Sequence, residues 1–296
     1  MAREFEFPGQ RARLIVIDVE TGGSRIVAES DTLLFEAPNW TEDGWLVVNG
    51  GGGLYRIEAE GGGALERIPL GDIPELNNDH VLSPDGRTVY VSAQDGHIYA
   101  AALDGTSQRR ITAIERPHYK HYLHGVTPDD GTLVFTGITR VADENGEMIV
   151  TLIPSAGGDE VLLTDDEHAD DGPEFSRDGA RILFNSERGS SEAGHAQLFS
   201  MAADGTDIRQ LTHDERVNWF PHQSPDASRI AYVSFPAGTL GHPANVADVR
   251  IRILEADGAT RELVSLFGGQ GTMNVPSWSP DGRRLAYVDY PRPEAE

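Results

Sequence analysis

The sequence predicts an all-β protein with the fold of a six-bladed β-propeller, and three observations carry this prediction. A tight turn of the type Ser/Thr-Pro-Asp-Gly recurs six times, at residues 41–44, 83–86, 127–130, 176–179, 224–227 and 279–282. Each turn precedes a short run rich in β-branched and aromatic residues, such as 88–91 and 230–233, which is typical of a strand. Asp-Gly turns at 104–105, 204–205 and 257–258 indicate a second hairpin in the same units. Four strands in each unit of 42 to 55 residues are typical of a propeller blade.

The composition of the recurrent turn follows from backbone chemistry. Proline presets φ at the first corner, aspartate accepts a local N–H group, and glycine adopts the left-handed conformation that ends the turn. Two copies depart from this pattern, with Asp130 and Ala227 in the place of glycine. Since alanine tolerates the left-handed region less well than aspartate, we expect the turn at 224–227 to be shifted by one residue.

The two ends of the chain predict how the ring closes. The sixth turn is followed by only one strand, at 285–288, whereas residues 13–17 and 25–27 form a hairpin that no turn of this type precedes. Pairing the N-terminal outer hairpin with the C-terminal inner hairpin completes one blade and removes the exposed sheet edges. We therefore expect a single domain, residues 1–296, with four-stranded antiparallel blades at approximately 37–73, 78–115, 121–165, 171–213, 218–266, and 274–290 completed by 12–30.

Composition narrows the classes of function. The chain has 24 Lys and Arg against 48 Asp and Glu, a net charge of −24, and no cysteine. A disulfide framework, a thiolate metal site and a thiol nucleophile are therefore excluded, and we expect no nucleic-acid partner because such binding begins with a basic surface. No apolar run reaches 18 residues, so we expect no membrane insertion. We expect a soluble monomer that is cytoplasmic as the chain stands, or periplasmic if a signal peptide was removed.

The repeat resembles that of a known family. An aromatic residue precedes the turn at 279–282, and an Asp-Gly-Thr turn at 204–206 leads to a strand that ends in Leu-Thr at 211–212. These features resemble the WD-like repeat of bacterial TolB-type propellers over residues 12 to 288. The same repeat occurs in propeller domains of prolyl-oligopeptidase-like enzymes and, more distantly, in oligogalacturonate lyases. TolB itself has an additional N-terminal domain, so the chain resembles the propeller of TolB rather than the whole protein.

The long, irregular loops predict which face carries function. The Ser/Thr-Pro-Asp-Gly and Asp-Gly turns lie on one face of the ring, and the long connections lie on the other, where functional residues concentrate on a rigid scaffold. Residues shortly before each recurrent turn should surround the mouth of the channel. The candidate ligand-binding residues at this mouth are His80, His124, Glu174, His222, Tyr122, Trp219, Phe220 and Asn274.

Two uses of this mouth stay open at the level of sequence. His80, His124, Glu174 and His222 could hold a divalent metal, although a polar channel also collects such residues without any ligand. Tyr122, Trp219 and Phe220 suit a protein-binding site, which the resemblance to TolB also implies, or they pack the loops.

We therefore predict a non-enzymatic TolB-like scaffold that binds a protein or peptide segment at the loop-rich mouth and needs no cofactor. No Gly-x-Ser-x-Gly elbow, phosphate-binding loop or His-Glu-x-x-His motif is present. The alternative is a metal-dependent carbohydrate-active enzyme that resembles oligogalacturonate lyase, whose family holds its metal with three His and a Gln. His222-Gln223 fit that pattern, but residues 272–277 lack the closely spaced His pair of the family.

Overall fold

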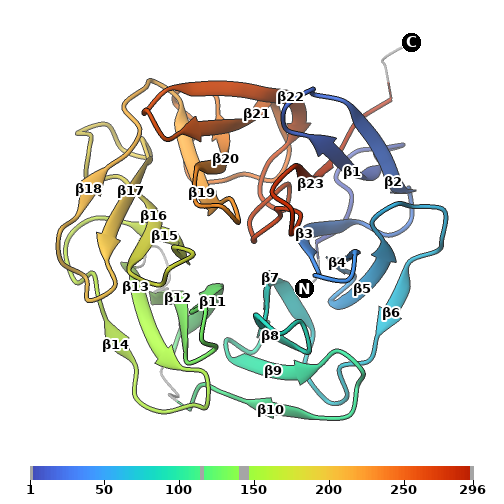
Figure 1. Cartoon of the computed structure of the whole chain (residues 1–296), viewed down its shortest axis with the longest axis horizontal. Coiled ribbons are helices and arrows are strands. Elements are labelled where there is room, and N and C mark those ends of the chain that lie inside the picture. The colour runs from blue at the N-terminus through green and yellow to red at the C-terminus, as the bar shows by residue number, and fades with distance from the viewer. Residues whose placement is uncertain (1–2, 114–116, 140–146, 294–296) are drawn as a thin grey trace.

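Six antiparallel sheets surround a central channel in the computed structural model, which describes residues 3–113, 117–139 and 147–293 (Figure 1). The predicted six-bladed propeller is confirmed. The predicted domain also includes residues 1–2, 114–116, 140–146 and 294–296, which lie outside the described residues. Two predicted blades are affected, at 78–115 and 121–165. Within the described part of the chain, no helix has the length and hydrophobicity to cross a membrane.

Five blades have four strands each, which run from the channel to the rim in chain order. The innermost strands are β3 (Phe35–Trp40), β7 (Leu76–Leu82), β11 (Tyr119–Val126), β15 (Asp170–Phe175) and β19 (Val217–Gln223). The second strands are β4 (Trp45–Gly50), β8 (Thr88–Ala93), β12 (Thr132–Thr139), β16 (Arg181–Ser186) and β20 (Arg229–Phe235). The third strands are β5 (Gly53–Glu58), β9 (Ile98–Ala102), β13 (Glu147–Pro154), β17 (Gln197–Ala202) and β21 (Val246–Glu255). The outermost strands are β6 (Glu66–Ile68), β10 (Gln108–Arg110), β14 (Val161–Leu162), β18 (Arg209–Gln210) and β22 (Thr260–Gly268).

The sixth blade closes the ring as predicted, but its innermost strand is reduced. β23 (Arg284–Asp289) pairs with β1 (Ala12–Asp18), which pairs with β2 (Ser24–Ser30). The register between β1 and β23 runs from Arg13 opposite Asp289 to Asp18 opposite Arg284. Inside β23, the chain makes only one bridge, between Trp278 and Leu285. Two further backbone hydrogen bonds, from Ala286 N–H to the Ser277 carbonyl and from Val288 N–H to the Thr272 carbonyl, both at 3.0 Å, hold the segment before the sixth turn against β23.

Hydrophobic packing between neighbouring blades holds the ring. The buried apolar side chains form six clusters, and each draws mainly on two adjacent blades. Between the sixth and the first blade, for example, Leu14 and Val288 pack against Phe35 and Leu46. Since every blade depends on both neighbours for its buried surface, the innermost strands are fixed relative to one another across the channel.

All six recurrent turns share one hydrogen-bond pattern. The Ser or Thr hydroxyl donates to the Asp two residues later at 2.6–2.7 Å and accepts the N–H group that begins the next strand at 2.8–3.0 Å. The bond from the Ser224 hydroxyl, with two more from Ser228, lowers the pKa of Asp226 to about 2. In five of the six turns the aspartate also accepts the N–H group of the residue two positions later at 3.0–3.1 Å, which confirms its predicted role there.

The prediction that the turn at 224–227 is shifted by one residue is wrong. Ala227 N–H donates to the Ser224 carbonyl at 2.9 Å, as Gly86 N–H does to the Ser83 carbonyl. Ala227 has a φ of 59° and Asp130 a φ of 60°, so both residues adopt the left-handed conformation in place of glycine. The hydroxyl and carboxylate bonds around Ser224 and Asp226 fix the turn more strongly than the conformational preference of alanine opposes it.

Candidate functional site in the central channel

Extra residues interrupt the innermost strands of the five four-stranded blades where these strands pass the channel, with one extra residue in β3, β11, β15 and β19 and two in β7. In every case the register between the innermost and the second strand shifts, which marks a β-bulge that turns side chains aside. Three of the bulges share a local sequence, in which a residue with φ between 55° and 60° is followed by a proline and then a polar residue: Ala37-Pro38-Asn39, Gly172-Pro173-Glu174 and Phe220-Pro221-His222. The bulges therefore place the predicted polar residues in the wall of the channel.

Glu174 and His222, two of the predicted site residues, are brought together. His222 Nδ1 lies 2.6 Å from Glu174 Oε2, and Nε2 lies 3.1 Å from the carbonyl oxygen of Met273. Both side chains are buried. Each ring nitrogen of His222 thus lies beside an oxygen atom of the chain. The carboxylate of Glu174 also accepts the N–H group of Gln223 at 3.2 Å, so this pair is satisfied within the chain.

His124 forms a second buried ion pair, with Asp171. Its Nε2 lies 3.4 Å from Asp171 Oδ1, and His242 Nε2 lies 3.6 Å from Asp171 Oδ2. Burial alone would lower the pKa of His124, but the contact with Asp171 and the charge of Asp79 raise it. Burial alone would raise the pKa of Asp171, but hydrogen bonds from His124 and His242 hold it well below its usual value. The directions of both pKa shifts favour the charged forms of His124 and Asp171.

Asn274 lies beside this pair and holds a second buried carboxylate. Its Nδ2 donates to Asp79 Oδ1 at 2.9 Å, while Asn77 Nδ2 donates to Asp79 Oδ2 at 2.8 Å. Burial raises the pKa of Asp79, and the nearby charge of Asp171 raises it further, whereas His124 lowers it. The side chain of Asn274 thus helps to position the carboxylate of Asp79 in the channel.

His80 does not join either pair. Its side chain is buried, neither ring nitrogen has a hydrogen bond of good geometry to the described residues, and burial lowers its pKa to about 4. Within residues 3–113, 117–139 and 147–293, no three His, Asp or Glu side chains are grouped so that they could share a metal ion. The four residues named for a metal site, His80, His124, Glu174 and His222, therefore form no common ligand set there.

The aromatic side chains pack within the channel instead of standing at its surface. Trp219 and Phe220 are buried, at 4% and 2% exposure. Trp219 contacts the ring of His242 at 4.5 Å between centroids, and Phe220 stacks on His124 at 5.8 Å. Tyr122 is partly buried in β11. Of the two uses that the sequence left open for these aromatic residues, the burial of Trp219 and Phe220 against the histidine rings is consistent with packing of the channel and its loops.

The loop-rich mouth is occupied by the N-terminal segment of the chain itself. Arg3 makes an ion pair with Glu36 at 3.2 Å, donates to the carbonyl oxygens of Gln270 at 2.8 Å and Ala244 at 3.2 Å, and lies 4.4 Å from the centre of the Tyr290 ring. Three blades and their connecting loops thus converge on one guanidinium group.

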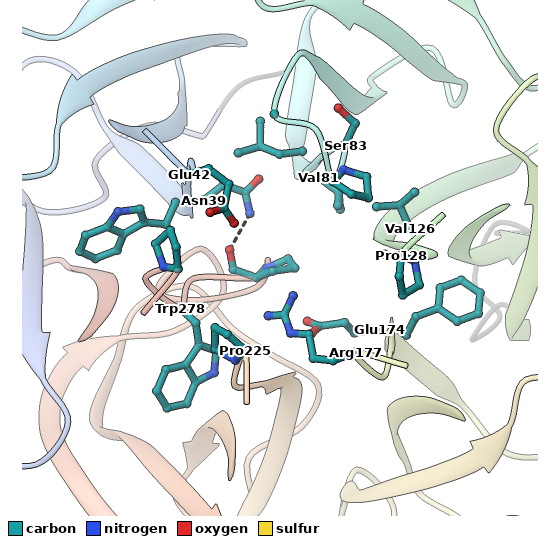
Figure 2. A pocket seen from close by; sticks show the side chains of 18 of the residues that line it. Asn39, Glu42, Val81, Ser83, Val126, Pro128, Glu174, Arg177, Pro225 and Trp278 are labelled. Carbon is teal, nitrogen blue, oxygen red and sulfur yellow. Dashed lines mark hydrogen bonds between the residues drawn. The ribbon is translucent and has the colours of Figure 1, made fainter. Parts of the chain in front are cut away.

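A cavity of about 300 Å³ opens at the opposite end of the channel, among the recurrent turns (Figure 2). Of the predicted site residues, only Glu174 lines it. Glu42 and Arg177 stand at its rim, at the turn position that is proline in the other four copies. This departure from the repeat was visible in the sequence, whereas the contact between Arg3 and Glu36 joins segments that no local pattern connects.

Comparison with known proteins places the chain among relatives, although no family model matches it. An uncharacterized protein of Agrobacterium fabrum is 36% identical over 286 residues, which cover 95% of this chain and 92% of the relative. The Tol-Pal system protein TolB of Francisella tularensis is 22% identical over 285 residues, and the match spans 92% of this chain but only 60% of that protein.

Two solved structures are also similar to this chain. A protein of Agrobacterium tumefaciens that is provisionally named TolB is 34% identical, with a TM-score of 0.86 over 96% of this chain and 99% of the other. An oligogalacturonate lyase in complex with manganese is 16% identical, with a TM-score of 0.61 over 90% of this chain and 74% of the lyase. At that identity, the likeness to the lyase shows the fold alone.

Proposed function

The chain belongs to the TolB-like family of six-bladed β-propellers, and from that premise we propose that it is a non-enzymatic scaffold that binds a basic protein or peptide segment at the loop-rich mouth of its channel. The observation that carries this proposal is the seat of Arg3. A polypeptide segment already lies across this mouth, and its arginine has an acidic, an aromatic and two carbonyl contacts.

The chemistry of the seat favours a cation. Glu36 is buried, and its burial raises the pKa of its carboxyl group. Besides the contact with Arg3, this carboxyl group accepts a hydrogen bond from Asn78 Nδ2 at 3.1 Å. Because a buried carboxylate without a cationic partner is costly, a guanidinium or ammonium group beside Glu36 stabilises the mouth. The ring of Tyr290 adds a cation–π contact that suits arginine. The net charge of −24 also attracts basic segments over a distance.

The test uses a variant that lacks residues 1–9 and a synthetic peptide of residues 1–10 as the probe. We expect saturable binding of the peptide by fluorescence anisotropy, at least tenfold weaker for a peptide with Arg3→Ala. Binding should also weaken at least tenfold when Glu36→Gln is added to the truncated chain. Glu75→Gln, which changes an exposed carboxylate in a connection of the same face, is the matched control and should leave the affinity unchanged.

Two outcomes would count against the proposal. One is a folded truncated chain, with an intact thermal transition, that does not bind the peptide. The other is binding that is equally strong for the Glu36→Gln and Glu75→Gln variants, since general attraction to an acidic protein would then be sufficient.

A further inference from the structure

The cavity at the turn-lined end has walls of two kinds. Its rim consists of the second residues of the six recurrent turns, which are Glu42, Pro84, Pro128, Arg177, Pro225 and Pro280 in the order of the blades. Deeper in, Trp278 and Phe175 supply apolar surface. The cavity volume of about 300 Å³ is at the lower end of the range of small-molecule sites, and polar side chains such as Asn39 and Glu174 share its lining with the apolar ones.

The two charged rim residues face each other across the channel. Glu42 belongs to the first blade in chain order and Arg177 to the fourth, so they stand on opposite sides of a ring of six. Figure 2 shows both side chains pointing into the pocket. Arg177 is held by its Nε and Nη2 atoms, which donate to the carbonyl oxygen of Gln223 at 3.2 and 2.8 Å. Its Nη1 and the carboxylate of Glu42 have no partner among the described residues.

A buried acceptor in the wall gives an independent sign of a ligand. Asn39 is 2% exposed and lines the cavity, and its Nδ2 donates to the carbonyl oxygen of Pro276 at 2.7 Å (Figure 2). Its Oδ1 is buried without a hydrogen bond from any described residue. A buried acceptor that stays unpaired costs free energy, which a donor from a ligand would recover. Asn39 and Glu42 come from the same blade, so their oxygens form an acceptor side opposite Arg177.

We propose that this cavity binds a small zwitterion of dipeptide size, with its ammonium group on Asn39 and Glu42 and its carboxylate on Arg177. An arginine with a free Nη donor is suited to a carboxylate, and the ammonium supplies the donor that Asn39 Oδ1 lacks. The charges stand on opposite walls, so the ammonium and carboxylate must be several bonds apart, as in a dipeptide. The apolar side chain of the ligand then contacts the tryptophan and proline wall.

The proposal concerns the end of the channel opposite the seat of Arg3, so it stands or falls independently of binding at the loop-rich mouth. The probe is the dipeptide Leu-Gly, titrated into the full chain by isothermal calorimetry. We expect N-acetyl-Leu-Gly, which lacks the ammonium, and Leu-Gly-amide, which lacks the carboxylate, each to bind at least tenfold more weakly.

Variants assign each charge to its wall. Arg177→Gln should weaken Leu-Gly but not Leu-Gly-amide, and Glu42→Gln should weaken Leu-Gly but not N-acetyl-Leu-Gly. Both residues are exposed, so the fold should be retained, and Arg87→Gln, an exposed arginine beside another turn, is the matched control. The absence of saturable binding, equal affinity for the three ligands, or equal effects of Arg177→Gln and Arg87→Gln would each overturn the proposal.

Discussion

The substitution Asp171→Asn tests whether the buried ion pair of the channel is charged. Asp171 Oδ1 accepts hydrogen bonds from the Thr136 hydroxyl at 2.7 Å and from Gly172 N–H at 2.8 Å, and an asparagine oxygen can accept both. What the variant removes is the negative charge beside His124 and His242. Removing one partner of a buried pair costs about 3–5 kcal/mol, and we expect about 3 kcal/mol at pH 6 because His124 can release its proton.

The sign of the pH dependence follows from the direction of the pKa shifts. The pKa of His124 is raised, so its pairing stabilises the fold fully below a pH of about 6.5 and is lost as the pH rises through the folded value. The pKa of Asp171 is lowered, so its contribution is present above a pH of about 4 and is lost only in strong acid. The cost of Asp171→Asn should therefore shrink toward pH 10, to about 1 kcal/mol for the remaining hydrogen bond.

The assay is thermal unfolding of both proteins at pH 6 and pH 10. For a chain of this size, about 1 kcal/mol corresponds to about 2 °C, so the melting temperature should fall by about 6 °C at pH 6 and about 2 °C at pH 10. Asp170→Asn is the matched control. Asp170 pairs with Arg188 at 2.5 Å, and arginine stays charged over this range, so its loss should be the same at both pH values. An equal loss at both pH values for Asp171→Asn would refute a charged His124.

Three further predictions concern the turns and the loop-rich mouth. Ala227→Gly should raise the free energy of unfolding by about 0.5–1 kcal/mol in denaturant titrations, because a left-handed alanine is strained. Gly258→Ala, at a position with a φ of 85° and open space around it, should lower that free energy by a similar amount. A loss of stability in Ala227→Gly would contradict this reasoning. The pKa of Asp226 is lowered to about 2, so the stabilisation by its charged form is present above a pH of about 4 and is lost as the pH falls to 2. The difference in unfolding free energy between the native chain and Asp226→Asn should therefore vanish between pH 4 and pH 2 in acid titrations. A constant difference would argue against this. Gly271→Ala would place a Cβ atom 2.3 Å from Glu36 Oε2, so limited trypsin digestion should release the N-terminal segment faster than in Gly258→Ala, and equal rates would exclude this coupling.

The fold could be predicted from the sequence because its signals are local. A turn is specified by four residues and a strand by a short apolar run, and counting both also predicts how the ends close. The prediction fails where long-range bonds override a local preference. Ala227 is one case, since strand pairing and the Ser224 hydroxyl hold it in a left-handed conformation that alanine alone disfavours. The reduced inner strand of the sixth blade is another, with its single bridge at Trp278.

The candidate site was predictable to the extent that it depends on distance from a turn. Glu174 and His222 each precede a turn by two residues, and the structure brings them together. The pairing of His124 with Asp171 depends on two bulges in neighbouring blades, which periodicity does not predict. The burial of Trp219 and Phe220 has the same cause. A bulge turns these side chains inward, where strand alternation alone gives no sign of it.

The two ends of the channel differ in whether their buried acceptor atoms already have a donor from the chain, and this difference allows the two binding proposals to be tested separately. At the loop-rich mouth, the chain supplies its own cation to Glu36, so an external segment must displace Arg3 and binding should strengthen when that segment is removed. At the turn-lined end, Glu174 is already satisfied by His222, whereas Asn39 Oδ1 has no donor among the described residues. No residue of 3–9 lines that cavity, so the affinity of a ligand there should be independent of residues 1–9. The same truncated chain therefore distinguishes the sites, with the basic peptide gained at one end and Leu-Gly unchanged at the other.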